Sequence, residues 1–124
     1  MMKIRSQQYA QKAYVWVEKV KAQPETVKEY RTLALTFPNM VLQSGLCQAV
    51  GFLLAKGESH HTLLLKHLTD LLNGNEDYEK LHRDILKADL TEYQLLTRKA
   101  LEAAAWLKRY TQALLPNPND NKKE

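Results

Sequence analysis

The sequence predicts an all-α fold, a single-domain bundle of about five to six helices. Apolar residues recur at steps of three and four along most of the chain, which is the spacing of an amphipathic helix. No segment shows the alternation of apolar and polar residues that is typical of a half-buried strand. The 124 residues suit one domain. A chain of this length can bury a core without disulfides or metals.

The most apolar stretch runs from residue 30 to residue 56. Arg31 and Lys56 carry charge at its ends, and no charged residue lies between them. Such a stretch must be mostly buried, because an exposed apolar patch of this size promotes aggregation. Polar residues and Pro38 interrupt it, so no run approaches the ~18 apolar residues that a bilayer requires. We therefore expect a central helical hairpin on which the other helices pack.

The first helix is expected over residues 7–22, with Ser6 as its N-cap. Its apolar stripe comprises Tyr9, Ala10, Ala13, Trp16, Val17 and Val20. On the opposite side, Arg5, Lys12 and Lys19 are seven residues apart and form one basic line. Two interpretations of that line stay open: a solvated helix face, or a row of phosphate contacts.

Proline divides the central hairpin. Pro24 suits the first turn of a helix over residues 24–37, because its missing N–H costs nothing there. Pro38 is expected to end that helix, and Asn39 to cap the next one, over residues 39–56.

Two glycines lie inside that third helix. Gly45 and Gly51 each cost about 0.5–1 kcal/mol relative to alanine within a helix. Close approach of a neighbouring element is the simplest reason for such a cost. Ser44 and Gly45 together predict a kink or break, and Gly57 is expected to cap the helix at its C-terminus.

Three further helices complete the expected bundle. They are predicted over residues 60–73, 76–87 and 90–115, capped by Ser59, Asn75 and Asp89 respectively. Asp89 and Glu92 are close to a capping box, which marks the start of the longest helix. The helical domain therefore covers residues 1–115, and the polar residues 116–124 are expected to form a disordered tail.

Net charge and cysteine content limit the possible partners and the cellular compartment of the protein. There are 18 Lys and Arg against 14 Asp and Glu, a mild basic excess that permits a polyanionic partner without requiring one. The single cysteine, Cys47, excludes an internal disulfide, and its apolar neighbours indicate a buried, inert thiol. The first residues lack the apolar segment of a secretory signal, so we expect a cytoplasmic protein without a membrane partner.

The residues give little support for an enzyme. His60 and His61 are adjacent and should point about 100° apart on a helix, so they cannot easily share a metal ion. His67 and Asp70 are three residues apart, which could give a weak metal site, but no second helix supplies an obvious carboxylate pair as further ligands. We therefore expect surface histidines, with no catalytic residue, no metal and no cofactor. Bound metal would instead favour a metal-dependent enzyme.

Two tyrosines are candidates for contact with nucleic acid. Tyr93 lies near Arg98, and Tyr110 directly follows Arg109, so each could stack on a base beside a cation. Aromatic residues at helical spacing more often belong to the core. Both interpretations stay open.

Three segments, in order along the chain, carry a family resemblance. The central one contains Tyr30-Arg31-Thr32-Leu33-Ala34, Phe37-Pro38, Ser44-Gly45-Leu46 and Phe52-Leu53-Leu54-Ala55-Lys56. The flanking ones are Arg5 to Ala10 with Tyr14, and Glu92 to Leu101 followed by Trp106 to Tyr110. Together they resemble the small helical subunit of the type III-B CRISPR (Cmr) RNA-guided effector complex. The likeness covers nearly the whole chain except the tail and residues 57–88.

This resemblance implies a non-catalytic structural subunit of an antiviral, RNA-targeting complex. Copies of the subunit would stack as a short filament beside the large subunit and the backbone subunits that hold the CRISPR RNA. Their basic surfaces would line the channel for single-stranded target RNA, while RNA cleavage and cyclic-nucleotide synthesis belong to other subunits. The alternative is a helical protein–protein adaptor with no nucleic-acid role, which the mild net charge favours.

The resemblance also selects candidate RNA contacts. The basic residues concerned are Arg31, Lys56, Arg98, Lys108 and Arg109, with Lys12 and Lys19 behind them. Each phosphate that such residues neutralise on a single strand contributes ~0.7 to the slope of log affinity against log salt. The break at Gly45 is interpreted as a shape required by a neighbouring subunit or strand.

Overall fold

The computed structural model describes residues 4–117, which are helical apart from short connections. The helices in this range are α1 Arg5–Lys21, α2 Pro24–Ser44, α3 Leu46–Lys56, α4 Ser59–Asn73, α5 Tyr78–Lys87 and α6 Leu90–Leu114. No strand occurs within residues 4–117. The prediction of an all-α bundle is therefore confirmed. The expected disordered tail falls mainly on residues 118–124, which lie outside the described range.

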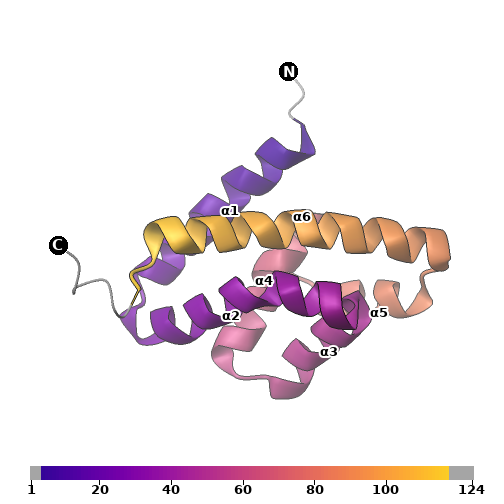
Figure 1. Cartoon of the computed structure of the whole chain (residues 1–124), viewed down its shortest axis with the longest axis horizontal. Helices are drawn as coiled ribbons and strands as arrows, with labels where there is room; N and C mark the ends of the chain where they lie inside the picture. Colours follow the sequence, from indigo (N-terminus) through magenta and orange to yellow (C-terminus); the bar gives the residue numbers. More distant parts are fainter. Residues whose placement is uncertain (1–3, 118–124) are drawn as a thin grey trace.

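α6, the longest helix, packs against α1, α2 and α4. α6 runs along the length of the molecule, α1 crosses it, and α2 lies beside it (Figure 1). α4 packs against α1, α2 and α6, while α3 and α5 contact each other. Each of the six helices contributes buried apolar side chains to one core. None of them is long and apolar enough to cross a membrane, as far as the described residues extend.

α2 continues through Pro38 to Ser44, so the expected helix break at this proline is wrong. Pro38 cannot donate a backbone hydrogen bond, which weakens the helix locally. The nearby Phe37 and Val41 are buried, with only 1% and 2% of their surface exposed. Burial of this face outweighs the lost hydrogen bond, because tertiary packing supplies most of a helix's stability in proteins. Asn39, the expected N-cap, is an exposed residue inside α2.

The hairpin turns at Gly45 instead, between α2 and α3. Gly45 has φ 89° and ψ 157°, a backbone conformation that is essentially restricted to glycine. A Cβ added there would also lie 3.3 Å from the hydroxyl oxygen of Tyr93 on α6. That oxygen accepts a hydrogen bond of 3.0 Å from the backbone N–H of the half-buried Cys47. Tyr93 thus satisfies an N–H in the first turn of α3, and the need for glycine arises within the chain itself.

Gly51 behaves differently from Gly45. A Cβ added at Gly51 would meet no neighbouring atom within 4 Å. The expected close approach of another element is therefore wrong at this position. Gly51 sits in the regular part of α3 without a local steric need for glycine.

Some helix ends differ from expectation by one or two residues. Ser6 lies inside α1 rather than capping it. α4 begins at Ser59, with Glu58 as its N-cap, and α5 is capped by Asp77 instead of Asn75. The N-caps of α1 and α4 are Ile4 and Glu58, which are not among the preferred capping residues, so cap preference alone does not select these helix starts.

The predicted start of α6 and the predicted end of α3 are confirmed. The backbone N–H of Glu92 donates to Asp89 Oδ1 at 2.8 Å, and the N–H of Asp89 donates to Glu92 Oε1 at 3.0 Å. This reciprocal capping box starts α6. Gly57 ends α3 in the left-handed conformation, with φ 63°, which glycine adopts without strain.

A buried polar pair joins α2 to α4. The Tyr30 hydroxyl lies 2.8 Å from His67 Nδ1, and the exposed fractions of the two residues are 0% and 1%. The prediction that His67 lies at the surface is wrong. Its neighbours Leu64, Leu68 and Leu71 on α4 are also buried, so the histidine belongs to the inner face of this helix.

α1 completes this arrangement from the other side. The Trp16 ring stacks on the His67 ring, with centroids 4.5 Å apart. The Trp16 indole N–H donates to Asp70 Oδ2 at 2.9 Å. Lys12 Nζ donates to the Asp70 carbonyl oxygen at 3.2 Å and lies 3.7 Å from its Oδ1. We call Lys12, Trp16, Tyr30, His67 and Asp70 the interhelical network, because it connects α1, α2 and α4.

Burial controls the charge of this network. Burial, with smaller contributions from Lys19 and Lys66, lowers the pKa of His67 to about 3. Burial also raises the pKa of Tyr30. Both side chains are therefore neutral over the ordinary pH range, and the Tyr30 hydroxyl keeps the proton that it can donate to Nδ1.

The buried imidazole makes stability depend on pH. Between the ordinary histidine pKa of 6.5 and the folded value of about 3, only the unfolded chain protonates His67. Stability should therefore fall with decreasing pH in this window, by about 1.4 kcal/mol per pH unit for one proton. The free energy of unfolding, measured by urea titration at several pH values, should lose this part of its slope in His67→Gln. Equal slopes in the two proteins would contradict the buried, neutral histidine.

The two glycines of the hairpin provide a matched pair of substitutions. Gly45→Ala should destabilise the fold by about 1–3 kcal/mol, because alanine is strained in this backbone conformation. Gly51→Ala should stabilise it by about 0.5–1 kcal/mol, because alanine is the better helix former. Urea denaturation of both variants tests the expectation. A neutral Gly45→Ala would show that the turn does not require glycine.

Candidate nucleic-acid interface

α6 presents two exposed arginines on one face. Arg98 and Arg109 are eleven residues apart and both exposed. That spacing is about three turns with a residual rotation of about 20°, and it corresponds to about 16 Å along the axis. Lys108 is half-buried and lies about 100° around the helix from Arg109. The predicted candidates on α6 thus include two that share an outward stripe.

A third arginine reaches this stripe from α1. Glu102 lies one turn after Arg98, and its Oε1 is 2.9 Å from Nη2 of Arg5 and accepts from Arg5 Nε at 3.0 Å. The carboxylate between Arg98 and Arg109 is therefore paired with a cation from another helix. We call Arg5, Arg98 and Arg109 the α6 basic face. Arg5 was predicted only as part of a line on α1, because the crossing of α1 over α6 is a tertiary feature.

Aromatic rings support one end of the α6 basic face. The Arg109 guanidinium carbon lies 5.2 Å from the Trp106 ring centroid, a distance suited to a cation–π contact. The Trp106 and Tyr110 rings are stacked at 5.7 Å, and Tyr110 meets Tyr14 edge-on at 5.4 Å. Tyr110 is therefore half-buried among other rings, and Tyr93 is engaged with Cys47 as described above. Both tyrosines have structural partners within the chain.

The two other candidate RNA contacts on α1, Lys12 and Lys19, differ in how far partners within the chain engage them. Lys12 is half-buried and contacts Asp70 in the interhelical network. Lys19 is exposed, with its Nζ 4.8 Å from the centroid of the Trp16 ring. Because Arg5 and Lys12 each pair with an internal carboxylate, the basic line on α1 is partly neutralised from within.

Arg31 and Lys56 lie on the central hairpin. Arg31 is half-buried on α2, and its Nε is buried without a hydrogen-bond partner in the described part of the chain. Lys56 is exposed at the end of α3, with its Nζ 5.7 Å from the Phe52 ring centroid. No ion pair joins either of them to a carboxylate within residues 4–117. Their contacts do not link them to the α6 basic face.

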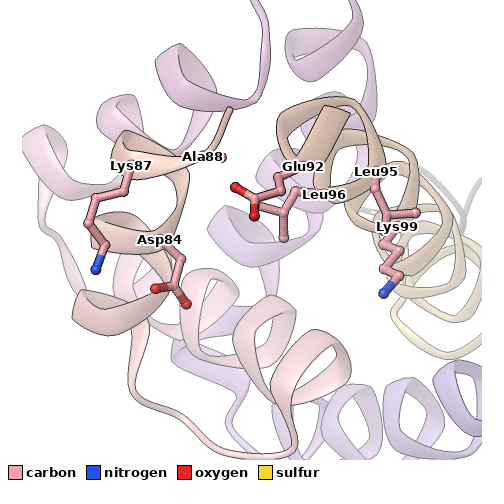
Figure 2. A pocket seen from close by; sticks show the side chains of 7 residues that line it. All are labelled: Asp84, Lys87, Ala88, Glu92, Leu95, Leu96 and Lys99. Carbon is pink, nitrogen blue, oxygen red and sulfur yellow. The ribbon is translucent and has the colours of Figure 1, made fainter. Parts of the chain in front are cut away.

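A shallow hollow lies between the end of α5 and the start of α6 (Figure 2). Asp84 and Lys87 line it from α5, and Glu92, Leu95, Leu96 and Lys99 line it from α6. The Lys80 ammonium donates to the Asp84 carboxylate at 2.9 Å and lowers the pKa of that group. Acidic and basic side chains alternate around this hollow, so it lacks the single sign of charge that favours a polyanion.

The adjacent histidines His60 and His61 differ in how deeply they are buried. His60 is half-buried at the start of α4, while His61 is buried and packs edge-on against the Phe52 ring at 5.7 Å. The expectation that both lie at the surface is wrong for His61. Burial, followed by the electrostatic effect of the neighbouring His60, lowers the pKa of His61. With Glu58 these residues form a group that could hold a metal ion.

Comparison with known proteins agrees with this architecture. The family model described as CRISPR-associated protein (Cas_Cmr5) matches residues 5–114. The chain is 43% identical over 114 residues to the CRISPR system Cmr subunit Cmr5 of Thermus thermophilus, a match that covers 92% of this chain and 98% of that protein. A crystal structure of a CRISPR-associated Cmr5 family protein from the same organism has a TM-score of 0.86 at 42% identity, over 93% of this chain and 100% of that one.

These matches span almost all of the helical region, including the segments on which the resemblance was based. High coverage of both partners means that the likeness concerns the whole fold rather than one motif. The predicted family is confirmed. The chain belongs to the Cmr5 family of CRISPR-associated proteins.

Proposed function

We propose that this protein is the small, non-catalytic subunit of a Cmr (type III-B) effector complex, and that its α6 basic face contacts single-stranded target RNA. Family membership supports the first part, since the relative from Thermus thermophilus is described as a Cmr subunit. The pairing of Glu102 with Arg5 supports the second part. It removes the negative charge that would otherwise separate Arg98 from Arg109.

The geometry of this face suits a phosphate backbone. Arg98 and Arg109 are exposed and about 16 Å apart, so they can reach phosphates several nucleotides apart on one strand. Contacts of this kind position a strand without reading its sequence. In a guide-directed complex, sequence is read by base pairing, so a subunit beside the target needs only such contacts. Lys108, Arg31, Lys56, Lys12 and Lys19 are proposed as weaker contributors.

Exposed apolar side chains at two separate places on the molecule support stacking of copies. Leu86, Leu90 and Leu95 are exposed at the α5–α6 end, with exposed fractions of 59%, 72% and 43%. Tyr14 and Val15 are exposed on α1, and Tyr14 contacts Tyr110 near the opposite end of α6. An interface between two different patches is head-to-tail, and such interfaces generate open filaments when the rotation does not close. The same surfaces are available to the large and backbone subunits.

A helical adaptor without a nucleic-acid role is the second candidate. It is favoured by the modest net charge of +4 and by the internal pairing of Arg5 and Lys12. Both candidates require assembly with other subunits. They differ in whether the retention of RNA by the assembled complex depends on Arg98 and Arg109.

Charge-matched variants distinguish the two candidates. Arg98→Gln, Lys108→Gln and Arg109→Gln are combined in one protein. Lys80→Gln, Arg83→Gln and Lys87→Gln, on the exposed side of α5, are combined in the control. Both proteins are reconstituted with the other subunits, and the affinity for single-stranded target RNA is measured against salt concentration. Loss of the two phosphate contacts of Arg98 and Arg109, together with the weaker one of Lys108, should reduce the salt slope by about 1.4 to 2 in the α6 variant alone.

Assembly is monitored in the same experiment, because RNA binding is meaningful only for complexes that contain the variant. If both variants assemble and show the native salt slope, the adaptor is the better description. If the α5 control loses as much affinity as the α6 variant, the contact surface has been assigned to the wrong helix.

A further inference from the structure

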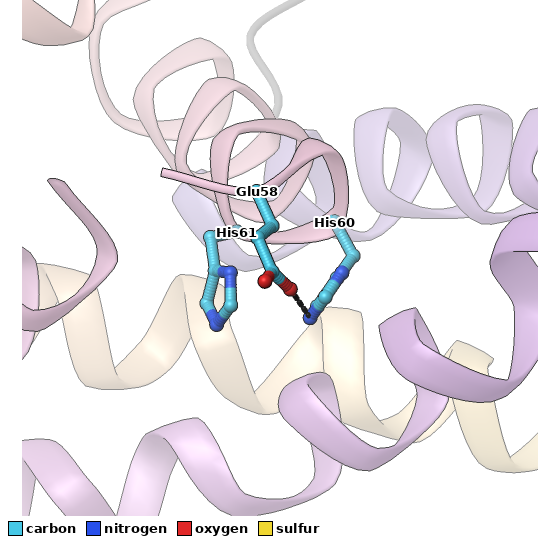
Figure 3. A group of neighbouring side chains, drawn as sticks. All are labelled: Glu58, His60 and His61. Atoms are coloured by element: carbon cyan, nitrogen blue, oxygen red, sulfur yellow. Dashed lines mark ion pairs between the residues drawn. The ribbon is translucent and has the colours of Figure 1, made fainter. Parts of the chain in front are cut away.

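Glu58, His60 and His61 lie together where the chain passes from α3 into α4 (Figure 3). Their candidate ligand atoms all fall within 4.8 Å of one another. His60 Nε2 is 3.9 Å from Glu58 Oε1, and the two imidazole rings are 4.1 Å apart between centroids. Adjacent histidines were expected to diverge too far to share a ligand. They converge because both side chains lean toward Glu58, which precedes the helix.

His61 supplies an independent observation that points to a ligand. Only 7% of its surface is exposed, and its Nδ1 is buried without a hydrogen-bond partner in the described residues. Figure 3 shows this nitrogen on the side of the ring that faces the Glu58 carboxylate. Buried polar atoms almost always have a partner, so an unpartnered imidazole nitrogen directed at a carboxylate and a second imidazole requires an explanation.

The surrounding charges are mixed, with carboxylates predominating on one side. Glu25 and Glu29 of α2 line a hollow together with Glu58 and His60. Lys56 precedes the group on α3, and Lys28 lines a neighbouring hollow with His60 and His61. The positive end of the α4 dipole also disfavours a cation here. A bound cation therefore depends on direct ligation by Glu58 and the two imidazoles.

We propose that Glu58, His60 and His61 bind a divalent transition-metal ion of the zinc type. Imidazole nitrogen and carboxylate oxygen are preferred ligands of such ions, at distances of about 2.0–2.2 Å. Ligand atoms around a tetrahedral ion are thus about 3.3–3.6 Å apart. Closing the group to that spacing requires side-chain rotation of the exposed Glu58 and of the half-buried His60. Three protein ligands leave a coordination position open for water or a group from a neighbouring molecule.

This site is separate from the α6 basic face, and its existence does not depend on the proposed function. Its ligands come from the α3–α4 connection and the first turn of α4, whereas the basic face uses α1 and α6. A metal there would connect the carboxylate outside α4 to two side chains of that helix. The expected consequence is a more rigid connection between α3 and α4.

Calorimetric titration of the full-length protein with Zn²⁺ tests the proposal. The native protein should bind one equivalent saturably, and Zn²⁺ should raise its midpoint of thermal unfolding. Glu58→Gln and His60→Gln should each weaken binding at least about 10-fold. His82→Gln, on α5 and outside the group, is the matched control and should bind as the native protein does.

Thermal unfolding without metal establishes that each variant is folded. Absence of saturable Zn²⁺ binding to the native protein would overturn the proposal. Native-like binding by both Glu58→Gln and His60→Gln would also overturn it, as would loss of binding in the His82→Gln control alone.

Discussion

The hydrogen bond between Tyr30 and His67 is buried where α1, α2 and α4 meet, and the positions of these helices depend on it. Neither group can be buried cheaply alone, because a polar atom removed from water needs a partner. Trp16 covers the His67 ring and bonds to Asp70, so α1 is held by both stacking and hydrogen bonding. Once α1 is fixed across the bundle, its first residue, Arg5, meets Glu102 on α6. The interhelical network and the direct packing of α1 on α6 together place Arg5 beside Glu102.

The cations of this chain fall into two groups by their partners. Lys12 and Arg5 compensate carboxylates that belong to the fold, Asp70 and Glu102. Both pairs bridge helices far apart in sequence, but the side chains of Arg5 and Lys12 are 43% and 42% exposed, so each pair adds only about 0–1 kcal/mol to the stability of the fold. Arg98 and Arg109 remain exposed without a carboxylate partner among the described residues. A modest net charge is therefore compatible with a local basic face, because internal pairing uses some charges and leaves others outward.

Periodicity predicted the helices because each of them buries one stripe, and local capping predicted the start of α6 because Asp89 and Glu92 satisfy each other. The hairpin was predicted less well. A proline rule placed the break at Pro38, but buried neighbours on both sides carry α2 on to Gly45. The candidate RNA-binding site was harder to predict than the hairpin, because it depends on contacts between segments that are distant in the sequence. The helical period of α4 places His67 on the same face as Leu64 and Leu71, so its burial was open to prediction, whereas no local pattern shows that the Arg5 guanidinium reaches α6.

In the assembled complex, we propose, the α6 basic face lies on the target strand. Photo-cross-linking measures this contact directly, with single-stranded target RNA that carries 4-thiouridine at successive positions and with peptide mapping of the cross-linked subunit. Cross-links should concentrate on α6 between Arg98 and Arg109 and on the start of α1 at Arg5. Cross-links confined to the outer side of α5, or their absence from this subunit in fully assembled complexes, would contradict the claim.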